Sequence, residues 1–223
     1  MREIFVQELG QVGDDLQRMS KLVIDAIENA STALQVADLQ LAEKVIKADE
    51  EIDEIERRID AQCISLLALQ APVATDLRVV IAALRMSGTI ERMGDLARHI
   101  AYVARGRYPE EAGSPVLRPI LLEMGEAATK VAHQVSTMLE TRDLELAAGV
   151  ERDDDRLDDL HKQTFSVLLD PDVEMTRQQM VDGVLLGRYL ERFGDHGVSV
   201  ARRISYLVTG DLSNSVLHAE DPA

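Results

Sequence analysis

The chain has 223 residues, of which 46% are hydrophobic and only 3% aromatic, and it contains no tryptophan. Such a length suits one large domain or two small ones, and a core of Leu, Ile, Val, Ala and Met favours helices over sheets. The formal net charge of −16 excludes nucleic acid and anionic membrane surfaces as favourable partners, because both are negatively charged.

The first half of the chain is expected to form three long helices. An apolar stripe that steps by three and four residues predicts an amphipathic helix over 5–34. The same periodicity predicts a second helix over 38–70, stopped by the proline that follows, and a third from about 77 to 105. Thr75 or Asp76 is expected to cap the third helix.

The second half is expected to contain three further helices. The stretch RGRYPEEAGSPVLRP contains two glycines and three prolines, and we interpret residues 107–119 as a linker. Beyond it the periodicity predicts a fourth helix, a fifth over 143–169, and a sixth that follows the break DPDVE and reaches Thr209. Residues 211–223 lack any period and are expected to form a flexible tail.

The two halves are related by an internal repeat. At a shift of 105 residues, DLQLAEKVIKADEEID aligns with DLELAAGVERDDDRLD, and at a shift of 100, IERMGDLA aligns with LERFGDHG. The second copy therefore lacks about five residues near its hairpin turn. Such identity over two separate helices indicates a tandem duplication. The predicted fold is all-α, with two antiparallel three-helix bundles, 1–106 and 120–210, related by a pseudo-twofold axis.

Each copy carries two pairs of carboxylates, and each pair is spaced four residues apart. The pairs lie equally far from the hairpin turn, so antiparallel helices set four carboxylates at one level. Such groups repel unless cations or protons neutralise them, and oxygen ligands favour Mg, Ca, Mn or ferric iron, with zinc as a further candidate. The predicted metal ligands are Asp49, Asp53, Glu91 and Asp95 in the first copy and Asp154, Asp158, Glu191 and Asp195 in the second.

Glycines and histidines lie beside these carboxylates. Gly94 and Gly194 interrupt helices at a cost of roughly 0.5–1 kcal/mol each relative to alanine, which close approach of a neighbouring helix or a metal would explain. His99 and His161 are candidate additional ligands, although neither recurs in the other copy. The alternative is that the acidic pairs form a solvated surface, screened by the arginines of the same motifs.

The sequence carries no sign of a membrane segment or of a common enzyme class. Cys63 is the only cysteine, which excludes an internal disulfide and fits a reducing cytosol. The N-terminus does not resemble a signal peptide, and the longest apolar run, VVIAAL, is too short to span a bilayer. No Ser/His/Asp set, P-loop or dinucleotide-binding loop is visible. We therefore expect a cytoplasmic protein that is not an enzyme.

The tandem three-helix repeats, the segment LLALQAPVATDLRVV and the motifs ERMGD and ERFGD resemble the PhoU family over residues 5–210. The resemblance implies a cytoplasmic regulator that acts with a phosphate-specific ABC transporter and represses the phosphate-starvation response. The implied partners are the ATPase subunit of the transporter and a membrane sensor histidine kinase. The resemblance also implies multinuclear iron or zinc clusters on the acidic motifs, and self-association as a homodimer is a further expectation.

Two other classes of protein remain as alternatives. A ferritin-like di-metal carboxylate protein would need a Glu-x-x-His motif on two helices, and no glutamate is followed by histidine at that spacing. A metal-free helical adaptor would leave the acidic pairs solvated. The segment LLDPDVEMTRQ, which we interpret as a shortened turn, is where the second copy departs from the pattern of the family.

Overall fold

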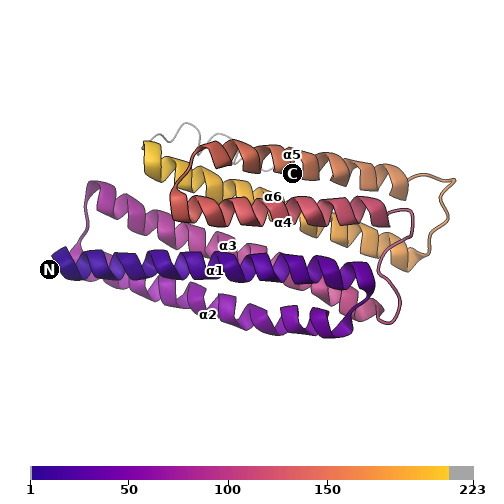
Figure 1. The fold of residues 1–223 in the computed structure, drawn as a ribbon, viewed down its shortest axis with the longest axis horizontal. Helices are drawn as coiled ribbons and strands as arrows, with labels where there is room; N and C mark the ends of the chain where they lie inside the picture. The colour runs from indigo at the N-terminus through magenta and orange to yellow at the C-terminus, as the bar shows by residue number, and fades with distance from the viewer. Residues whose placement is uncertain (1, 211–223) are drawn as a thin grey trace.

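The computed structural model describes residues 2–210 as six helices that run along the length of an elongated molecule (Figure 1). The predicted flexible tail, 211–223, lies outside the described residues. Within the described residues there is no strand, so the all-α prediction is confirmed. The helices are α1 (Arg2–Val36), α2 (Leu39–Gln70), α3 (Ala74–Arg107), α4 (Arg118–Thr141), α5 (Glu145–Leu168) and α6 (Arg177–Thr209).

The six helices form the two predicted three-helix bundles. Helices α1, α2 and α3 all pack on one another, as do α4, α5 and α6. The bundles meet where α1 packs on α4 and α3 packs on α6, while α2 and α5 lie on the outside (Figure 1). Each helix at the interface therefore meets its own counterpart, which is the arrangement that a twofold relation produces.

Most helix ends agree with the sequence prediction, but the predicted cap of α3 is wrong. Asp38 caps α2, because its carboxylate accepts a hydrogen bond of 3.0 Å from the backbone N–H of Leu41. Helix α3 begins at Ala74, so the extended residue Val73 occupies the N-cap position without a side-chain hydrogen bond. Thr75 and Asp76 lie inside the first turn of the helix, beyond the N-cap position.

The second hairpin differs from the first in a way that the sequence did not indicate. Helix α5 has 24 residues and α2 has 32, whereas the connection after α5, 169–176, is longer than the connection after α2, 71–73. The second copy is therefore shortened in its helix, and the prediction of a shortened turn is wrong. Helix α6 begins with a capping box, in which Thr176 and Gln179 satisfy each other's backbone N–H groups.

The apolar stripes predicted from the sequence form the core. Every predicted stripe residue of α1 is buried except Leu9, which is partly buried. One pair of charges ties the end of α3 to the other bundle: Arg107 donates two hydrogen bonds, of 2.7 and 3.0 Å, to the carboxylate of Asp182 on α6. Asp182 is only 2% exposed, whereas the side chain of Arg107 is 32% exposed, so the ion pair joins a buried carboxylate to an arginine that reaches the surface.

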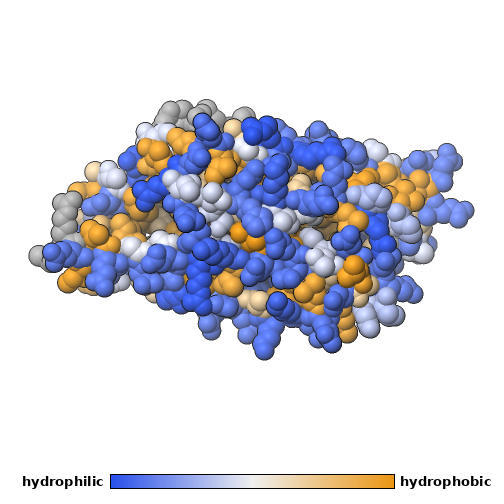
Figure 2. Space-filling model, in the orientation of Figure 1, coloured by the Kyte–Doolittle hydropathy of each residue, from blue (hydrophilic) through white to orange (hydrophobic). Residues whose placement is uncertain are grey.

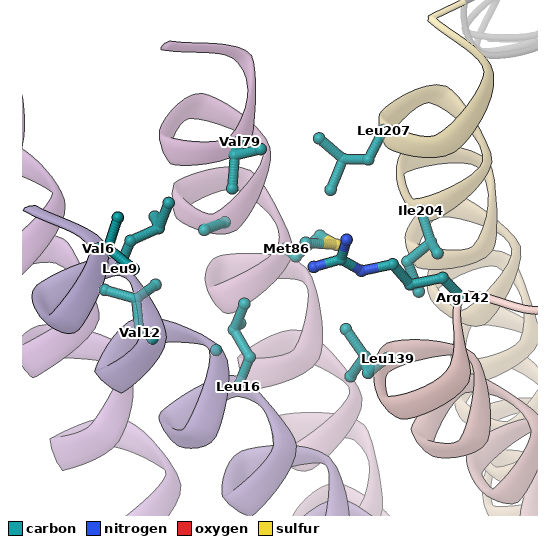
Figure 3. A pocket seen from close by; sticks show the side chains of 13 residues that line it. Val6, Leu9, Val12, Leu16, Val79, Met86, Leu139, Arg142, Ile204 and Leu207 are labelled. Atoms are coloured by element: carbon teal, nitrogen blue, oxygen red, sulfur yellow. The ribbon is translucent and has the colours of Figure 1, made fainter. Parts of the chain in front are cut away.

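The face drawn in Figure 2 is mostly polar, and an apolar pocket lies between helices of the two bundles. Figure 2 shows hydrophilic side chains over most of the face drawn, interrupted by scattered hydrophobic ones. No helix within residues 2–210 has the length and apolarity that a membrane span requires. A pocket of about 400 Å³ lies among α1, α3, α4 and α6 (Figure 3). Its lining includes Gly13, Met86, Leu139 and Leu207.

Candidate functional site

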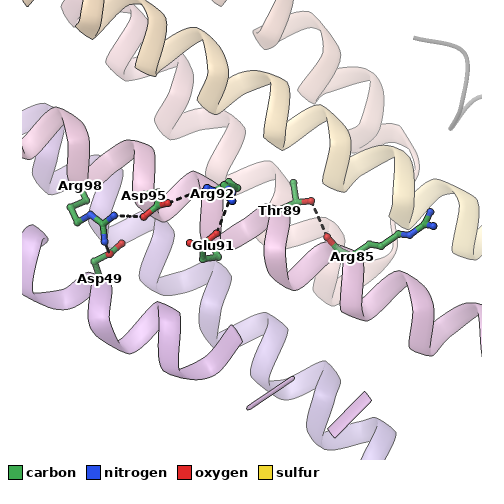
Figure 4. Close-up of polar contacts among 7 residues, drawn as sticks. All are labelled: Asp49, Arg85, Thr89, Glu91, Arg92, Asp95 and Arg98. Atoms are coloured by element: carbon green, nitrogen blue, oxygen red, sulfur yellow. Dashed lines mark hydrogen bonds and ion pairs between the residues drawn. The ribbon is translucent and has the colours of Figure 1, made fainter. Parts of the chain in front are cut away.

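The first acidic cluster, defined as Asp49, Asp53, Glu91 and Asp95, lies between α2 and α3. Asp49 is 4% exposed and faces Asp95 across the two helices (Figure 4). A single guanidinium joins them: Arg98 Nη1 donates to Asp49 Oδ2, and Arg98 Nη2 donates to Asp95 Oδ1. The structure thus brings the two acidic motifs of the first copy together with an arginine between them.

The other charges of the first acidic cluster are less well compensated. Arg92 lies 3.6 Å from Glu91 and 3.7 Å from Asp95, but its side chain is 65% exposed, so these contacts are weak. Burial and then the charge of Asp95 raise the pKa of Glu91 to about 7. Burial also raises the pKa of Asp49 to about 6, against the opposing effect of Arg98. The cluster therefore holds negative charge in a place that disfavours it.

The second acidic cluster, defined as Asp154, Asp158, Glu191 and Asp195, lies between α5 and α6. Asp154 Oδ1 is buried and has no hydrogen-bond partner among the described residues. Burial, followed by the charges of Asp195 and Asp158, raises the pKa of Asp154 to about 7. The pKa values of Glu191 and Asp195 are also raised, chiefly by burial.

One arginine contacts the second acidic cluster, at its edge. Arg188 Nη1 donates to both carboxylate oxygens of Glu191, at 2.7 and 2.8 Å. Within residues 2–210, no arginine or lysine is hydrogen-bonded to Asp154 or Asp195. The second acidic cluster therefore lacks the central cation that Arg98 supplies to the first.

The glycines of the two motifs allow the helices to approach closely. A Cβ atom added at Gly94 would lie 2.9 Å from Ile52 Cδ1, a contact closer than van der Waals packing allows. A Cβ atom at Gly194 would lie 2.4 Å from Asp154 Oδ1 and 2.6 Å from Leu157 Cδ1. Close approach of the facing helix therefore explains the glycines.

The two clusters differ in how well they suit a metal ion. Among the described residues, no three or more His, Cys, Asp or Glu side chains are arranged so that they could hold a metal. In the first acidic cluster, Arg98 already uses oxygens of Asp49 and Asp95, which does not fit a metal. In the second, an all-oxygen donor set with an unpartnered oxygen on Asp154 fits a hard cation chemically. The metal sites remain a prediction at all eight residues.

The two candidate histidines pack against aromatic rings. The ring of His99 lies 5.1 Å from that of Tyr189, centre to centre, so this contact belongs to the interface between α3 and α6. The ring of His161 lies 5.0 Å from that of Phe165 on the same helix. Burial lowers the pKa of both histidines, which favours neutral rings. Their role as additional metal ligands remains untested.

Arg98 is the residue of this site that the sequence prediction missed. On the sequence it follows Asp95 by three residues and resembles the many arginines on helix surfaces. The internal repeat held the signal, because the position equivalent to Arg98 at a shift of 100 is Val198. A difference between the copies at that point, inside an otherwise matched acidic motif, marks the two clusters as unequal.

The chain is similar to known proteins over most of its length. The sequence profile of the PhoU domain matches twice, over residues 16–104 and 121–204. "Phosphate-specific transport system accessory protein PhoU homolog 2" of Mycobacterium tuberculosis is 40% identical over 210 residues, which cover 94% of this chain and 99% of that protein. "Phosphate-specific transport system accessory protein PhoU homolog" of Synechocystis is 33% identical over 215 residues, which cover 94% of this chain and 93% of that protein.

Solved structures show the same fold. The crystal structure of PhoU from Pseudomonas aeruginosa matches with a TM-score of 0.86 and 31% identity, covering 93% of this chain and 100% of the other. The phosphate transport system regulatory protein PhoU from Streptococcus pneumoniae shares the fold alone, with a TM-score of 0.82 at 24% identity. Because the profile covers more than half of the chain and relatives match it nearly end to end, the chain belongs to the PhoU family.

Proposed function

We propose that this protein regulates phosphate uptake and phosphate-starvation signalling as an accessory of a phosphate-specific transport system. The observation that carries the proposal is the similarity to accessory proteins of that description, 40% identical over 94% of the chain. Both PhoU repeats are present, so the likeness extends to the whole two-bundle architecture. A role without catalysis of its own is part of the proposal.

The protein acts in this proposal as an adaptor at the cytoplasmic side of the membrane. Its partners are the ATPase subunit of the transporter and a sensor histidine kinase, and it pairs with itself as a homodimer. The net charge of −16 suits complementary basic surfaces on protein partners. Chemical crosslinking in cells, followed by detection of the ATPase and the kinase, tests the adaptor role. Recovery of neither partner would contradict it.

The second acidic cluster is proposed to hold iron or zinc, with manganese, magnesium or calcium as other candidates. Asp154, Asp158, Glu191 and Asp195 would hold the metal, which would supply a positive charge beside Asp154, whose buried Oδ1 has no hydrogen-bond partner among the described residues. A metal that binds only the folded protein stabilises it by RT ln(1 + [L]/Kd), about 2.7 kcal/mol at a hundredfold excess over Kd. Metal analysis of protein purified without affinity-tag metals tests the site.

Deletion of the gene tests the regulatory proposal directly. We expect phosphate-responsive genes to stay switched on in phosphate-rich medium, and the wild-type gene to restore repression. A strain whose expression is unchanged would count against the proposed function. Complementation by a variant with Asp154→Asn and Asp158→Asn separates regulation from metal binding, because it removes two proposed ligands without changing the size of either side chain.

A metal-free helical adaptor is a second candidate, and Arg98 favours it. Arg98 is hydrogen-bonded to Asp49 and Asp95, so the chain itself supplies a cation to two carboxylates of the first acidic cluster. In that case, exhaustive chelation would leave both the fold and partner binding intact. Loss of partner binding after chelation, with recovery on adding metal, would exclude this candidate.

A further inference from the structure

The two acidic clusters occupy equivalent places in the repeat but differ at one central residue. The motifs align at a shift of 100, so Glu91 and Asp95 correspond to Glu191 and Asp195. Three residues further along the same helices, Arg98 corresponds to Val198. A basic side chain in one copy is thus replaced by an apolar one in the other, although the carboxylates are retained.

Arg98 is held in the first acidic cluster from both sides. It donates to Asp49 on α2 and to Asp95 on α3, so one guanidinium joins the two helices of the hairpin. The side chains of Asp49 and Asp95 are 5% and 18% exposed, and that of Arg98 is 25% exposed. The ion pair is therefore largely shielded from water, unlike the contacts of the exposed Arg92.

We infer that Arg98 is a built-in counter-ion that closes the first acidic cluster to metal, so that metal enters only the second. This inference rests on the proposed function where it concerns metal in the second cluster. What it adds is that the two copies differ in their ability to bind metal. It departs from the expectation that the duplication creates two equivalent metal sites.

The physical reason is competition for the same oxygens. To bind in the first cluster, a metal ion would need the carboxylates of Asp49 and Asp95, and these would first have to release Arg98. The displaced guanidinium would then lie beside a second cation, within the same partly buried space, and like charges there repel strongly. In the second cluster the equivalent residue, Val198, carries no charge that a metal would have to displace. Asp154 Oδ1 has no hydrogen bond among the described residues that metal binding would break.

Two arginine variants test the role of Arg98 without metal. Arg98→Val gives the first copy the residue of the second, and Arg92→Val removes an equal charge from an exposed site in the same motif. In the presence of a chelator we expect Arg98→Val to lower the melting temperature by roughly 5 °C or more, because it strands buried carboxylates. Arg92→Val should change it little. Equal melting temperatures for the two variants would overturn the inference.

Binding of Mn²⁺, followed by electron paramagnetic resonance, tests where metal enters. We expect the wild type to bind Mn²⁺ and the double variant Asp154→Asn with Asp158→Asn to bind none. The double variant Asp49→Asn with Asp53→Asn should bind as much Mn²⁺ as the wild type. Arg98→Val should gain additional bound Mn²⁺ that Asp49→Asn removes again, whereas Arg92→Val should gain none. These results would establish that Arg98 keeps metal out.

The outcomes separate this inference from the proposed function. If Asp49→Asn with Asp53→Asn lowers the Mn²⁺ bound by the wild type, Arg98 does not exclude metal and the inference is wrong, while the proposed metal binding stands. If the wild type binds no Mn²⁺ in either cluster, the metal part of the proposed function fails for this ion. The melting temperatures in chelator then decide for or against Arg98 as a counter-ion.

Discussion

Gly94 and Gly194 show how a locally unfavourable residue is compensated by its surroundings. An interior glycine destabilises a helix by roughly 0.5–1 kcal/mol relative to alanine. Here each glycine lies where the facing helix comes too close for a Cβ atom, with Ile52 at one position and Leu157 at the other. The same close approach places the acidic motifs against each other, so the glycines help to set the distance between the carboxylates.

Alanine substitution should have opposite effects at a crowded and at an open glycine. Gly194→Ala should destabilise the protein by about 1–3 kcal/mol, because the new methyl group overlaps Leu157 Cδ1 and Asp154 Oδ1. Gly13→Ala should stabilise it by roughly 0.5–1 kcal/mol, because nothing lies within 4 Å of a Cβ atom there. Urea unfolding measures both. Equal shifts of the two midpoints would show that helix propensity alone decides.

The raised carboxylate pKa values predict that the metal-free protein is more stable in mild acid. Asp154 has a pKa of about 7 in the folded state, against about 4 for an unfolded aspartate, so the folded protein binds more protons between these values. The stabilisation that protonation of Asp154 gives the folded protein is therefore complete below pH 4 and is lost as the pH rises through 7. Glu91, with a pKa of about 7, acts in the same direction.

Melting temperatures measured in chelator from pH 5 to pH 8 test this prediction. We expect the wild type to melt at a lower temperature at pH 8, and Asp154→Asn to reduce the dependence on pH and to raise the melting temperature at pH 8. Asp159→Asn is the matched control, because its side chain is 64% exposed on the same helix. A wild type that gains stability toward pH 8 would contradict the assignment of the shifted groups.

At the scale of helices, the bundles are held together by a small number of polar contacts within an apolar interface. Arg107 and Asp182 form the most buried of these contacts between α3 and α6. Ser20 on α1 and Ser136 on α4 are joined by a hydrogen bond of 2.9 Å. Such paired groups fix how one helix lies along another, because a shift would leave a buried polar atom unpaired.

Removal of Arg107 should destabilise the protein much more than removal of an exposed arginine. Arg107→Met leaves the carboxylate of Asp182, which is 2% exposed, with only the hydrogen bond from Gln178, and we expect a loss of roughly 3 kcal/mol. Arg18→Met breaks an ion pair with Glu51 in which both side chains are exposed, and should cost about 0.5 kcal/mol or less. Chemical unfolding of both variants provides the comparison, and similar losses would mean that burial of the pair is unimportant.

The limits of prediction from sequence follow from the range of each interaction. The apolar stripe of α1 and the start of α2 near Asp38 depend on residues close in the chain, and both were predicted correctly. The end of α5 was predicted to within about one residue, but the connection 169–176 was interpreted as a shortened turn, because a gap in the repeat shows that residues are missing without showing which element lost them. The ion pair between Arg107 and Asp182 joins residues far apart in the sequence, so it cannot be predicted from a local sequence pattern.

The sequence predicted which carboxylates face each other in the candidate site, but not what compensates their negative charge. Equal distances from the turn correctly placed Asp49 opposite Asp95. Whether such carboxylates meet a metal, a proton or an arginine depends on side chains outside the acidic motif. In the first copy Arg98 lies between Asp49 and Asp95, and this contact became visible only in the structure.

At the scale of the whole molecule, each bundle depends on the other to cover its interface helices. A chain of residues 1–106 would expose the faces of α1 and α3 that normally pack on α4 and α6. We expect this half to fold only as a self-associated species, because those faces are apolar. Sedimentation of the half and of the full chain measures the result. A stable monomeric half would show that the bundles fold independently.

The pairing of α1 with α4 and of α3 with α6 also bears on how the two copies could come to differ. Two identical subunits joined by this interface would necessarily carry the same residue at both equivalent positions. Fusion into one polypeptide removes that constraint, because each copy can then mutate alone. Arg98 and Val198 are such a divergence. Covalent linkage thus allows a symmetric scaffold to hold one acidic site that is bridged by an arginine and one that is not, an asymmetry that no homodimer of single repeats can encode.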